Sequence, residues 1–383
     1  MMKRKKGLSI LLAVSLLLGS IGIPSYAAGL DERTIQLGTE GLDSVVEEVV
    51  MLPDKHYNPQ DYLYLGKAGE QPIKWRVLDA EKNNAGENTG IFLLSETVVD
   101  ILQFDTDETA NEGQTNPNEW QNSDIVAWFK NTLTGTTYFT QSELDSLQAV
   151  TKTEPAQEAG PEAKFGYPME ENTLVNEKLF APSIPEIWEY VSTYRGVPGL
   201  KVLGVDGAAK GWWTRTALGN NPLHVMMFDY SGWHFYVKVS GVWGARPATN
   251  IAKNAVLFTS QAEGGKSLGN SLGLEAVEYG SVKEWKLTLL DSSRQFALQE
   301  RTKQAAAGES ITLTYSGAKT GDKEYISALL VKAGEVLSYG RILKPTQASG
   351  NVTIDLPDTL SDGVYSLHVF NEEYNGGEED NTK

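Results

Sequence analysis

Residues 211–216 read Gly-Trp-Trp-Thr-Arg-Thr, and residues 241–248 read Gly-Val-Trp-Gly-Ala-Arg-Pro-Ala. Between them, the apolar run 225–228 and the strand-like run 233–239 flank the turn sequence Asp-Tyr-Ser-Gly at 229–232. Short apolar runs joined by turns that contain glycine are typical of strands and hairpins. This part of the chain therefore predicts a small antiparallel sheet with little helix.

Upstream of this segment, the sequence predicts strands followed by helices. Apolar runs indicate strands at 61–66, 73–79 and 90–95. A helix is expected over 120–133, with Ser123 as a plausible N-cap, and two more begin at capping boxes, Thr-Gln-Ser-Glu at 140–143 and Ser-Ile-Pro-Glu at 183–186. We therefore expect a mixed α+β domain at residues 59–259.

The C-terminal part of the chain has a different pattern. Residues 260–283, rich in Gly, Ser and Glu, are expected to form a linker. Strand-like runs recur about every ten residues over 284–383, which predicts an all-β sandwich. The sequence around Tyr365 resembles the tyrosine corner of immunoglobulin-like domains. Polar sequence follows where a seventh strand is expected, so either that strand lies beyond the last residue or the sandwich is short; we favour the first.

The first 27 residues have the layout of a secretory signal peptide. Four basic residues at 3–6 precede an apolar run at 8–23, and Ser-Tyr-Ala at 25–27 provides a cleavage site. The run is shorter than the roughly 20 apolar residues that span a membrane. We expect cleavage after residue 27 or 28, which leaves residues 28–58 as a polar leader or linker and no integral membrane span.

Composition narrows the location and the classes of partner. The chain contains no cysteine, which excludes disulfide scaffolds, thiol nucleophiles, iron–sulfur clusters and a lipid anchor at the cleavage point. An export signal on a cysteine-free chain suits a Gram-positive bacterium, so we expect a secreted or cell-wall-associated protein. Its formal net charge of -17 becomes more negative once the basic leader is removed, and such a surface repels nucleic acid.

Clustered tryptophans and arginines are the candidate ligand-binding residues. The set consists of Trp212, Trp213, Arg215, Trp233, Trp243 and Arg246. Aromatic rings can stack on sugar rings, and guanidinium groups bind carboxylates with two parallel hydrogen bonds. This chemistry indicates a glycan or a cell-surface protein or peptide as the ligand. The alternative is that the indoles fill a core and the arginines tie loops together, an alternative that applies least to Trp233 because it lies beside a turn.

Enzymatic and metal-binding patterns are weak in this sequence. The four histidines are scattered, no hydrolase motif is present, and the loop that begins at Asp105 lacks the glycine and the final glutamate of an EF-hand. We therefore expect no catalytic residues, no metal site and no cofactor, with a looser calcium site on the acidic loop 105–119 as an alternative to a solvated loop. A carbohydrate-active hydrolase remains an alternative, with paired acids from the loops 105–119 and 154–171. A structural surface scaffold is a second alternative.

A set of short motifs resembles a domain of unknown function in secreted Gram-positive proteins. The motifs are Ile73-x-Trp75-Arg76-Val77-Leu78, Leu93-Leu94-Ser95, Trp120-x-x-Ser123, Trp128-Phe129-x-Asn131, Trp212-Trp213-x-Arg215 and Gly244-x-Arg246-Pro247-Ala248. The last two are also similar to the C-type-lectin-like fold of formylglycine-generating enzymes. The resemblance implies a C-type-lectin-like α+β domain followed by an immunoglobulin-like module. The enzyme branch needs cysteines that this chain lacks, so its activity does not carry over and the resemblance implies architecture alone. We expect a non-enzymatic binding protein because of the export signal, the clustered aromatic residues, the missing catalytic motifs and the modular C-terminal part.

Overall fold

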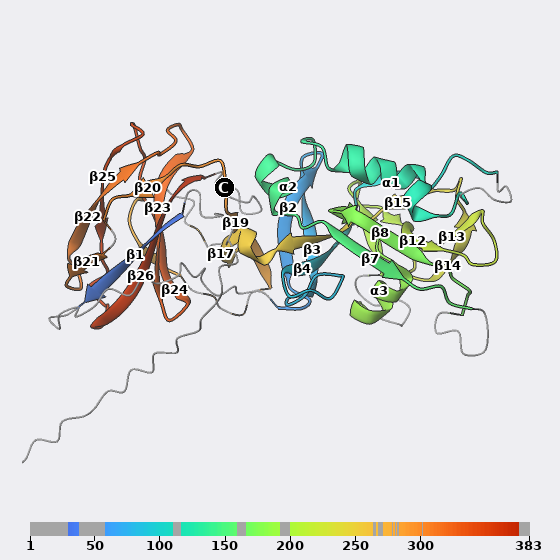
Figure 1. Ribbon diagram of the computed structural model, residues 1–383, viewed down its shortest axis with the longest axis horizontal. Coiled ribbons are helices and arrows are strands. Elements are labelled where there is room, and N and C mark those ends of the chain that lie inside the picture. The colour runs from blue at the N-terminus through green and yellow to red at the C-terminus, as the bar shows by residue number, and fades with distance from the viewer. Residues whose placement is uncertain are drawn as a thin grey trace, which may run out of the picture.

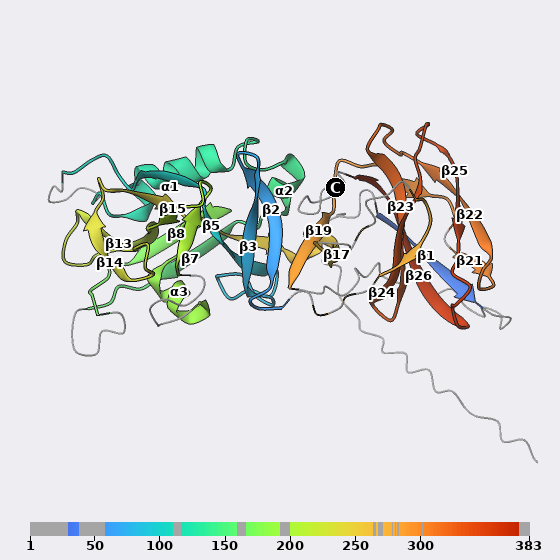
Figure 2. The ribbon, with the colours of Figure 1, turned by 180° about the vertical axis from the view of Figure 1, so that it is seen from behind.

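A computed structural model describes residues 30–37, 58–109, 116–158, 166–191, 200–262, 266, 271–277, 279, 281, 283–300 and 302–374. The signal peptide predicted at 1–27 lies outside the described residues, as does most of the leader predicted at 28–58. No helix within the described ranges is long and apolar enough to cross a membrane. Figures 1 and 2 show two lobes side by side, the first formed by the blue, green and yellow part of the chain and the second by its orange and red part.

The first lobe is built on a seven-stranded sheet and a five-stranded sheet. The seven-stranded sheet has the order β17 (Val256–Gln261), β19 (Glu284–Leu289), β2 (Tyr62–Ala68), β3 (Gln71–Asp79), β4 (Gly90–Ser95), β16 (Ala248–Ala252), β9 (Leu179–Phe180). The five-stranded sheet has the order β14 (His234–Lys238), β13 (His224–Phe228), β12 (Trp212–Ala217), β15 (Val242–Ala245), β6 (Asp100–Gln103). The strands predicted in the first half of the lobe and the hairpin predicted around residues 229–232 are present.

Smaller elements join these two sheets. They are a three-stranded sheet of β11 (Ala209–Lys210), β10 (Val202–Gly204) and β5 (Thr97–Val98), and the pair β7 (Val150–Glu154) and β8 (Asn172–Glu177). The helical segments are η1 (Trp120–Asn122), α1 (Asp124–Trp128), η2 (Phe129–Leu133), α2 (Gln141–Ser146), α3 (Ile184–Tyr190) and η3 (Lys253–Ala255). The N-cap at Ser123 and the capping boxes at Thr140 and Ser183 are confirmed.

The mixed α+β class expected for this chain is wrong. The protein is 48% strand and 10% helix, arranged in several small sheets. The helices are shorter than predicted because residues expected near their C-terminal ends pair with strands elsewhere in the chain. Leu147, expected on the second helix, bridges to Ile251, and Val150 begins strand β7. With the α+β class overturned, the C-type-lectin-like assignment loses its support.

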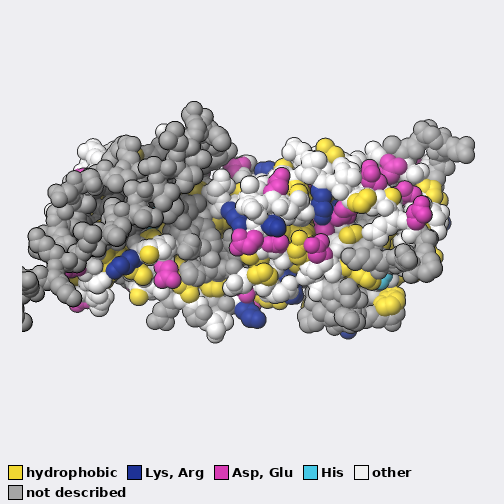
Figure 3. Space-filling view, turned by 60° about the horizontal axis from the view of Figure 1, so that its bottom comes forward, with side chains coloured by type: hydrophobic (Ala, Val, Ile, Leu, Met, Phe, Trp, Pro, Cys, Tyr) yellow, Lys and Arg dark blue, Asp and Glu magenta, His cyan; other side chains and the backbone are white. Residues whose placement is uncertain are grey.

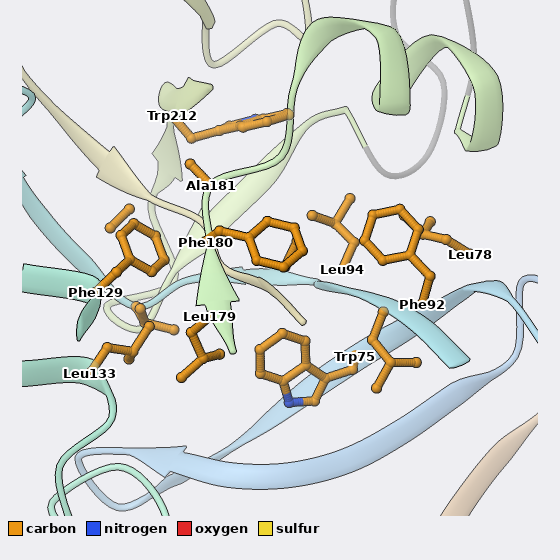
Figure 4. Close-up of a cluster of buried hydrophobic side chains, with 14 of the residues drawn as sticks. Trp75, Leu78, Phe92, Leu94, Phe129, Leu133, Leu179, Phe180, Ala181 and Trp212 are labelled. Carbon is orange, nitrogen blue, oxygen red and sulfur yellow. The ribbon is translucent and has the colours of Figure 1, made fainter. Parts of the chain in front are cut away.

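The core of the first lobe is large and aromatic. Figure 4 shows Trp75 of β3, Phe180 of β9 and Trp212 of β12 in one cluster of buried side chains, and each of the three is 0% exposed. The Trp75 indole donates a hydrogen bond of 2.8 Å to the backbone oxygen of Leu65, so its polar atom is satisfied inside the core. Burying aromatic surface of this kind is the main source of stability available to a chain without disulfides.

The second lobe is a β-sandwich. Its larger sheet has the order β18 (Glu275–Ala276), β24 (Glu335–Leu343), β23 (Glu324–Lys332), β26 (Gly363–Glu373), β1 (Leu30–Leu37), β21 (Thr302–Ala305), and its smaller sheet has the order β20 (Ala297–Leu298), β22 (Ser310–Ser316), β25 (Gly350–Asp355). Side chains from both sheets share one apolar core. The Tyr365 hydroxyl donates to the backbone oxygen of Ser361 at 2.9 Å, the contact expected of a tyrosine corner. The relationship to immunoglobulin domains stays a prediction.

The strand expected to be missing after β26 has a counterpart at the other end of the chain. Residues 30–37, expected to belong to a polar leader, form β1 and pair antiparallel with β26 along their whole length. Figure 1 shows this blue strand inside the orange and red lobe. The sequence did not reveal this because strand pairing over such a separation leaves no local signal.

The boundary between the lobes also differs from expectation. The sequence predicts residues 284–289 in the sandwich, but β19 pairs with β2 and β17 in the first lobe, and the Trp285 indole donates to Asp61 at 3.0 Å. Leu257 and Phe258 of β17 pack on second-lobe residues, including Tyr339, whose ring lies 5.7 Å from that of Phe258. An apolar contact therefore joins the lobes.

A buried ion pair lies beside this contact. The Lys266 ammonium, within the predicted linker, lies 2.9 Å from the Glu372 carboxylate of β26, and both side chains are at most 1% exposed. Ser327 and Tyr339 donate hydrogen bonds to the other oxygen of Glu372. At this residue the predicted linker is therefore fastened to the sandwich.

Replacing Lys266 by Ala should destabilise the protein by about 3–5 kcal/mol, because it leaves the buried Glu372 charge without its cation. Lys344→Ala is the matched control, since Lys344 lies 3.5 Å from Asp322 in an exposed pair, and it should change stability by less than about 1 kcal/mol. Urea denaturation followed by tryptophan fluorescence measures both. Equal effects of the two substitutions would contradict the role given to Lys266.

Candidate functional site

Two of the predicted ligand-binding tryptophans lie in the core. Trp212 and Trp213 are 0% exposed. Trp212 stacks on Phe228 with ring centroids 4.5 Å apart and donates its indole N–H to the backbone oxygen of Leu200 at 3.1 Å. Trp213 donates to the backbone oxygen of Leu102 at 2.9 Å. Neither indole is accessible to a ligand, so the core alternative holds for this pair.

Arg246 is also buried. Its guanidinium lies over the Trp212 ring at 4.7 Å, and its Nε donates to the backbone oxygen of Ser95 at 2.7 Å. Burial lowers the pKa of Arg246 to about 10, and the Glu96 carboxylate, 3.5 Å away, opposes that shift. Arg246 therefore ties β15 to the end of β4 and does not face a ligand.

Arg215 is the centre of a buried ionic network. Its two terminal nitrogens donate to both oxygens of Glu186, at 2.6 and 2.8 Å, and one of them also donates to Glu154 at 2.9 Å. Lys152 lies 2.9 Å from Glu186 and 3.1 Å from Glu154. The backbone N–H of Ser183 donates to Glu186 at 3.0 Å, so the capping box of α3 is part of the same network.

The opposite charges of this network keep one another ionised. Burial opposes ionisation of Glu186, but the cations Arg215 and Lys152 outweigh it and hold the pKa of that carboxyl well below its ordinary value. Burial likewise opposes the charge of Arg215, and Glu154 and Glu186 raise its pKa above the ordinary value. The network fixes β12 against α3 and the pair β7 and β8, which is a structural role.

Trp243 lies on β15, which pairs in parallel with β12. It is half-buried on β15 and packs on the core. A side-chain carbon at Gly241 would lie 2.7 Å from its Nε1, and one at Gly211 would lie 2.9 Å from its ring. Gly211 and Gly241, the first residues of the two motifs at 211–216 and 241–248, therefore make room for this indole.

Trp233 is the predicted residue that the structure places at the surface. It is 38% exposed, and Tyr230 and Tyr236 of the same hairpin are 66% and 43% exposed. The Asp229 carboxylate accepts hydrogen bonds from the backbone N–H groups of Ser231 and Trp233, at 2.8 and 2.9 Å. This local hydrogen bonding is typical of aspartate in turns, and it fixes the backbone that carries Trp233.

Further rings support these exposed ones. The His234 ring lies 5.6 Å from that of Trp233 and 5.4 Å, edge to face, from that of Trp188 on α3. Tyr236 meets Tyr167 edge to face at 5.4 Å. We call the set Tyr167, Trp188, Tyr230, Trp233, His234 and Tyr236 the aromatic surface. Figure 3 shows hydrophobic side chains beside a histidine at the right-hand end of the molecule.

The sequence did not indicate that Tyr167 and Trp188 belong to the aromatic surface. Tyr167 and Trp188 come from segments far from the hairpin, and no sequence spacing indicates that they approach it. Tyr230, Trp233 and Tyr236 do carry a signal, because they recur every third residue around a Ser-Gly turn. A turn places its flanking residues at the surface more often than a strand interior does.

A pocket of about 350 Å³ lies on the same lobe. Its lining residues are Asn116, Glu119, Trp120, Gln121, Glu170, Glu171, Asn172, Thr173, Arg215 and Ala217. Glu119 accepts hydrogen bonds from the backbone N–H of Asn116 at 3.1 Å and from the side chain of Asn122 at 2.9 Å. Glu170 and Glu171 are exposed to solvent. The pocket is therefore polar and lined mainly by acids and amides.

The acidic loop that begins at Asp105 is partly described. Asp105 accepts a hydrogen bond from the backbone N–H of Asp107 at 2.7 Å, and burial raises its pKa. Among the described residues, no group of three His, Asp or Glu side chains is placed to hold a metal ion.

Replacing Glu186 by Gln should cost about 3–5 kcal/mol of stability at neutral pH, because Arg215 loses its paired charge. The folded-state pKa of Glu186 lies below its ordinary value of 4.5, so its contribution is present above about pH 4.5 and is lost as the pH falls through the folded value. The difference in unfolding free energy between wild type and Glu186→Gln should therefore be smaller at pH 3 than at pH 7. A difference that does not change with pH would exclude this ionic role.

Comparison with known proteins relates part of the chain to a protein family. No curated protein and no solved structure matches the chain significantly. Residues 88–253, less than half of the 383-residue chain, match a domain of unknown function, DUF6273. This range contains every residue of the aromatic surface and of the pocket. A domain of unknown function is therefore found at residues 88–253, and both candidate sites belong to it.

Proposed function

We propose that this chain is a secreted or cell-wall-associated, non-enzymatic binding protein of a Gram-positive bacterium, and that it binds a glycan through the aromatic surface. The observation that carries the proposal is the exposure of three large aromatic residues, Tyr230, Trp233 and Tyr236, on one hairpin. Exposed apolar groups gathered in one place are typical of interaction sites, and Trp and Tyr are enriched where binding energy concentrates. The export signal predicted from residues 1–27 supports the location.

The construction of the hairpin suits a preformed site. Asp229 orders the turn, and His234 is held between Trp188 and Trp233. Rings that are already fixed lose little conformational entropy when a ligand binds. Tyr and His also carry polar atoms beside their apolar faces, which matches the alternation of C–H faces and hydroxyl groups on a sugar.

The choice of glycan over peptide rests on the side chains. β14 is the edge strand of its sheet, so a peptide could also add to it by backbone pairing. The largest exposed side chains of the hairpin, however, are the rings of Tyr230, Trp233 and Tyr236, which offer flat apolar faces on which sugar rings can stack. We therefore propose the glycan and treat the peptide as an outcome of the test.

Trp233→Ala and Tyr236→Ala should each weaken glycan binding at least about tenfold, the effect of removing an aromatic residue that contributes about 1.4 kcal/mol or more. Binding of the mature protein is measured on an array of bacterial cell-wall glycans and peptidoglycan fragments, followed by titration of the best ligand. Circular dichroism verifies that each variant is folded.

Val242→Ala is the matched control, because Val242 is 61% exposed on β15 of the same sheet but does not belong to the aromatic surface. It should bind as wild type does. The proposal is wrong if wild type binds no glycan, if Trp233→Ala binds as tightly as wild type, or if a peptide library is retained and the glycans are not.

A second candidate function is supported by the pocket. The hydrolase alternative uses paired acids from the loops 105–119 and 154–171. The pocket is lined by Glu119 from the first loop and by Glu170 and Glu171 from the end of the second. A general acid needs apolar surroundings that keep its proton. Glu170 and Glu171 are exposed to water, which is why we place hydrolysis second. The other alternative, a purely structural scaffold, predicts no concave pocket lined by Trp or Arg, whereas Trp120 and Arg215 line this one.

If the pocket is a hydrolase site, wild type should release reducing ends from a glycan panel, and Glu119→Gln or Glu170→Gln should lower that rate at least about 100-fold. Glu189→Gln, an exposed acid of α3 outside the pocket, is the control and should keep the wild-type rate. Absence of hydrolysis by wild type across the panel would exclude this second function.

A further inference from the structure

The strand β1 is an internal strand of the second lobe, although it comes from the N-terminal end of the chain. Leu30 pairs with Phe370 and Leu37 with Gly363, so eight residues are matched to β26. On the other side, residues 34–37 pair in parallel with β21. Figures 1 and 2 both show the blue strand among orange and red ones.

Removal of β1 would divide this sheet in two. Residues 363–370 of β26 would lose their backbone partner on one side, and β21 would lose its connection to the sheet. Unpaired backbone groups along a strand edge are a template for another strand. The gap between β26 and β21 is thus a site that accepts an eight-residue strand, and we call it the strand-acceptor site.

No covalent bond besides the chain itself holds β1 in the strand-acceptor site of its own molecule. The chain contains no cysteine, so no disulfide fixes β1. Residues 38–57 connect it to the first lobe, and such a stretch can extend to about 65–70 Å. Signal cleavage, predicted after residue 27 or 28, leaves β1 at a free end. A terminal strand on a long connection can pair with its own acceptor or with the identical acceptor of a neighbour.

We propose that the strand-acceptor site takes residues 30–37 of a second copy of this chain, so that exported chains assemble by exchanging N-terminal strands. Exchange forms the same ladder with β26 and β21, so the two forms differ mainly in the effective concentration of the strand. The fraction of molecules in the exchanged form rises with the protein concentration, and the local concentration is high for molecules gathered at a cell surface. This interface is independent of the aromatic surface and of the ligand proposed for it.

The test uses the mature chain, beginning at residue 28, prepared with natural and with heavy nitrogen isotopes. The two preparations are mixed at low and high concentration, and native mass spectrometry measures the dimers. Wild type should form dimers of mixed isotopic mass, in a fraction that rises with concentration. Ile35→Pro should abolish them, because proline removes a backbone donor from a strand paired on both sides. Ile35→Val keeps that donor and should dimerise as wild type does.

A labelled peptide of residues 30–37 provides the second measurement. Ile35→Pro, whose own strand is unable to pair, should bind this peptide at least tenfold more tightly than a scrambled peptide of the same composition. Wild type should bind it more slowly, because β1 must leave first. Peptide binding without any mixed dimer would overturn the choice of a second copy as partner. Absence of both would overturn the strand-acceptor site itself.

Discussion

The buried pairing of Arg215 with Glu186 is the interaction on which the arrangement of the first lobe depends. It joins β12, in the middle of the five-stranded sheet, to the first turn of α3, and Lys152 and Glu154 bring β7 into the same network. α3 carries Trp188, whose ring packs on His234. The position of Trp188 within the aromatic surface therefore depends on a buried ion pair. A buried pair of this kind is costly to break, so it holds the helix in one place.

The arrangement of the second lobe depends on a strand from the other end of the chain. The sandwich obtains β1 from the N-terminus, while β19 extends the first lobe's sheet with a strand from beyond the linker. The chain therefore passes between the lobes more than once, and the apolar contact around Phe258 joins them. Neither lobe corresponds to one continuous stretch of sequence. Truncation at residue 260 would remove β19 from one lobe as well as most of the sandwich.

Local chemistry was predictable and long-range pairing was not. The capping boxes at Thr140 and Ser183 were predicted correctly, because both partners of each lie within four residues. The length of the helices was not, since apolar spacing does not show where a residue such as Val150 finds a strand partner. The same holds for the site. The sequence showed that tryptophans cluster, but whether an indole lies in a core depends on long-range packing. Every residue of β12 is buried, Trp243 is half-buried, and Trp233, beside a turn, is exposed.

Trp212 and Trp213 are core residues, whereas the rings of the Trp233 hairpin, on which the proposed binding depends, are open to solvent. Hydroxyl-radical footprinting of the native protein, read by peptide mass spectrometry, tests this directly because oxidation of an indole requires contact with solvent. We predict rapid oxidation of Trp233 and Tyr230, with Trp212 and Trp213 protected until the protein unfolds. Oxidation of Trp212 or Trp213 at the rate of Trp233 under native conditions would contradict the claim.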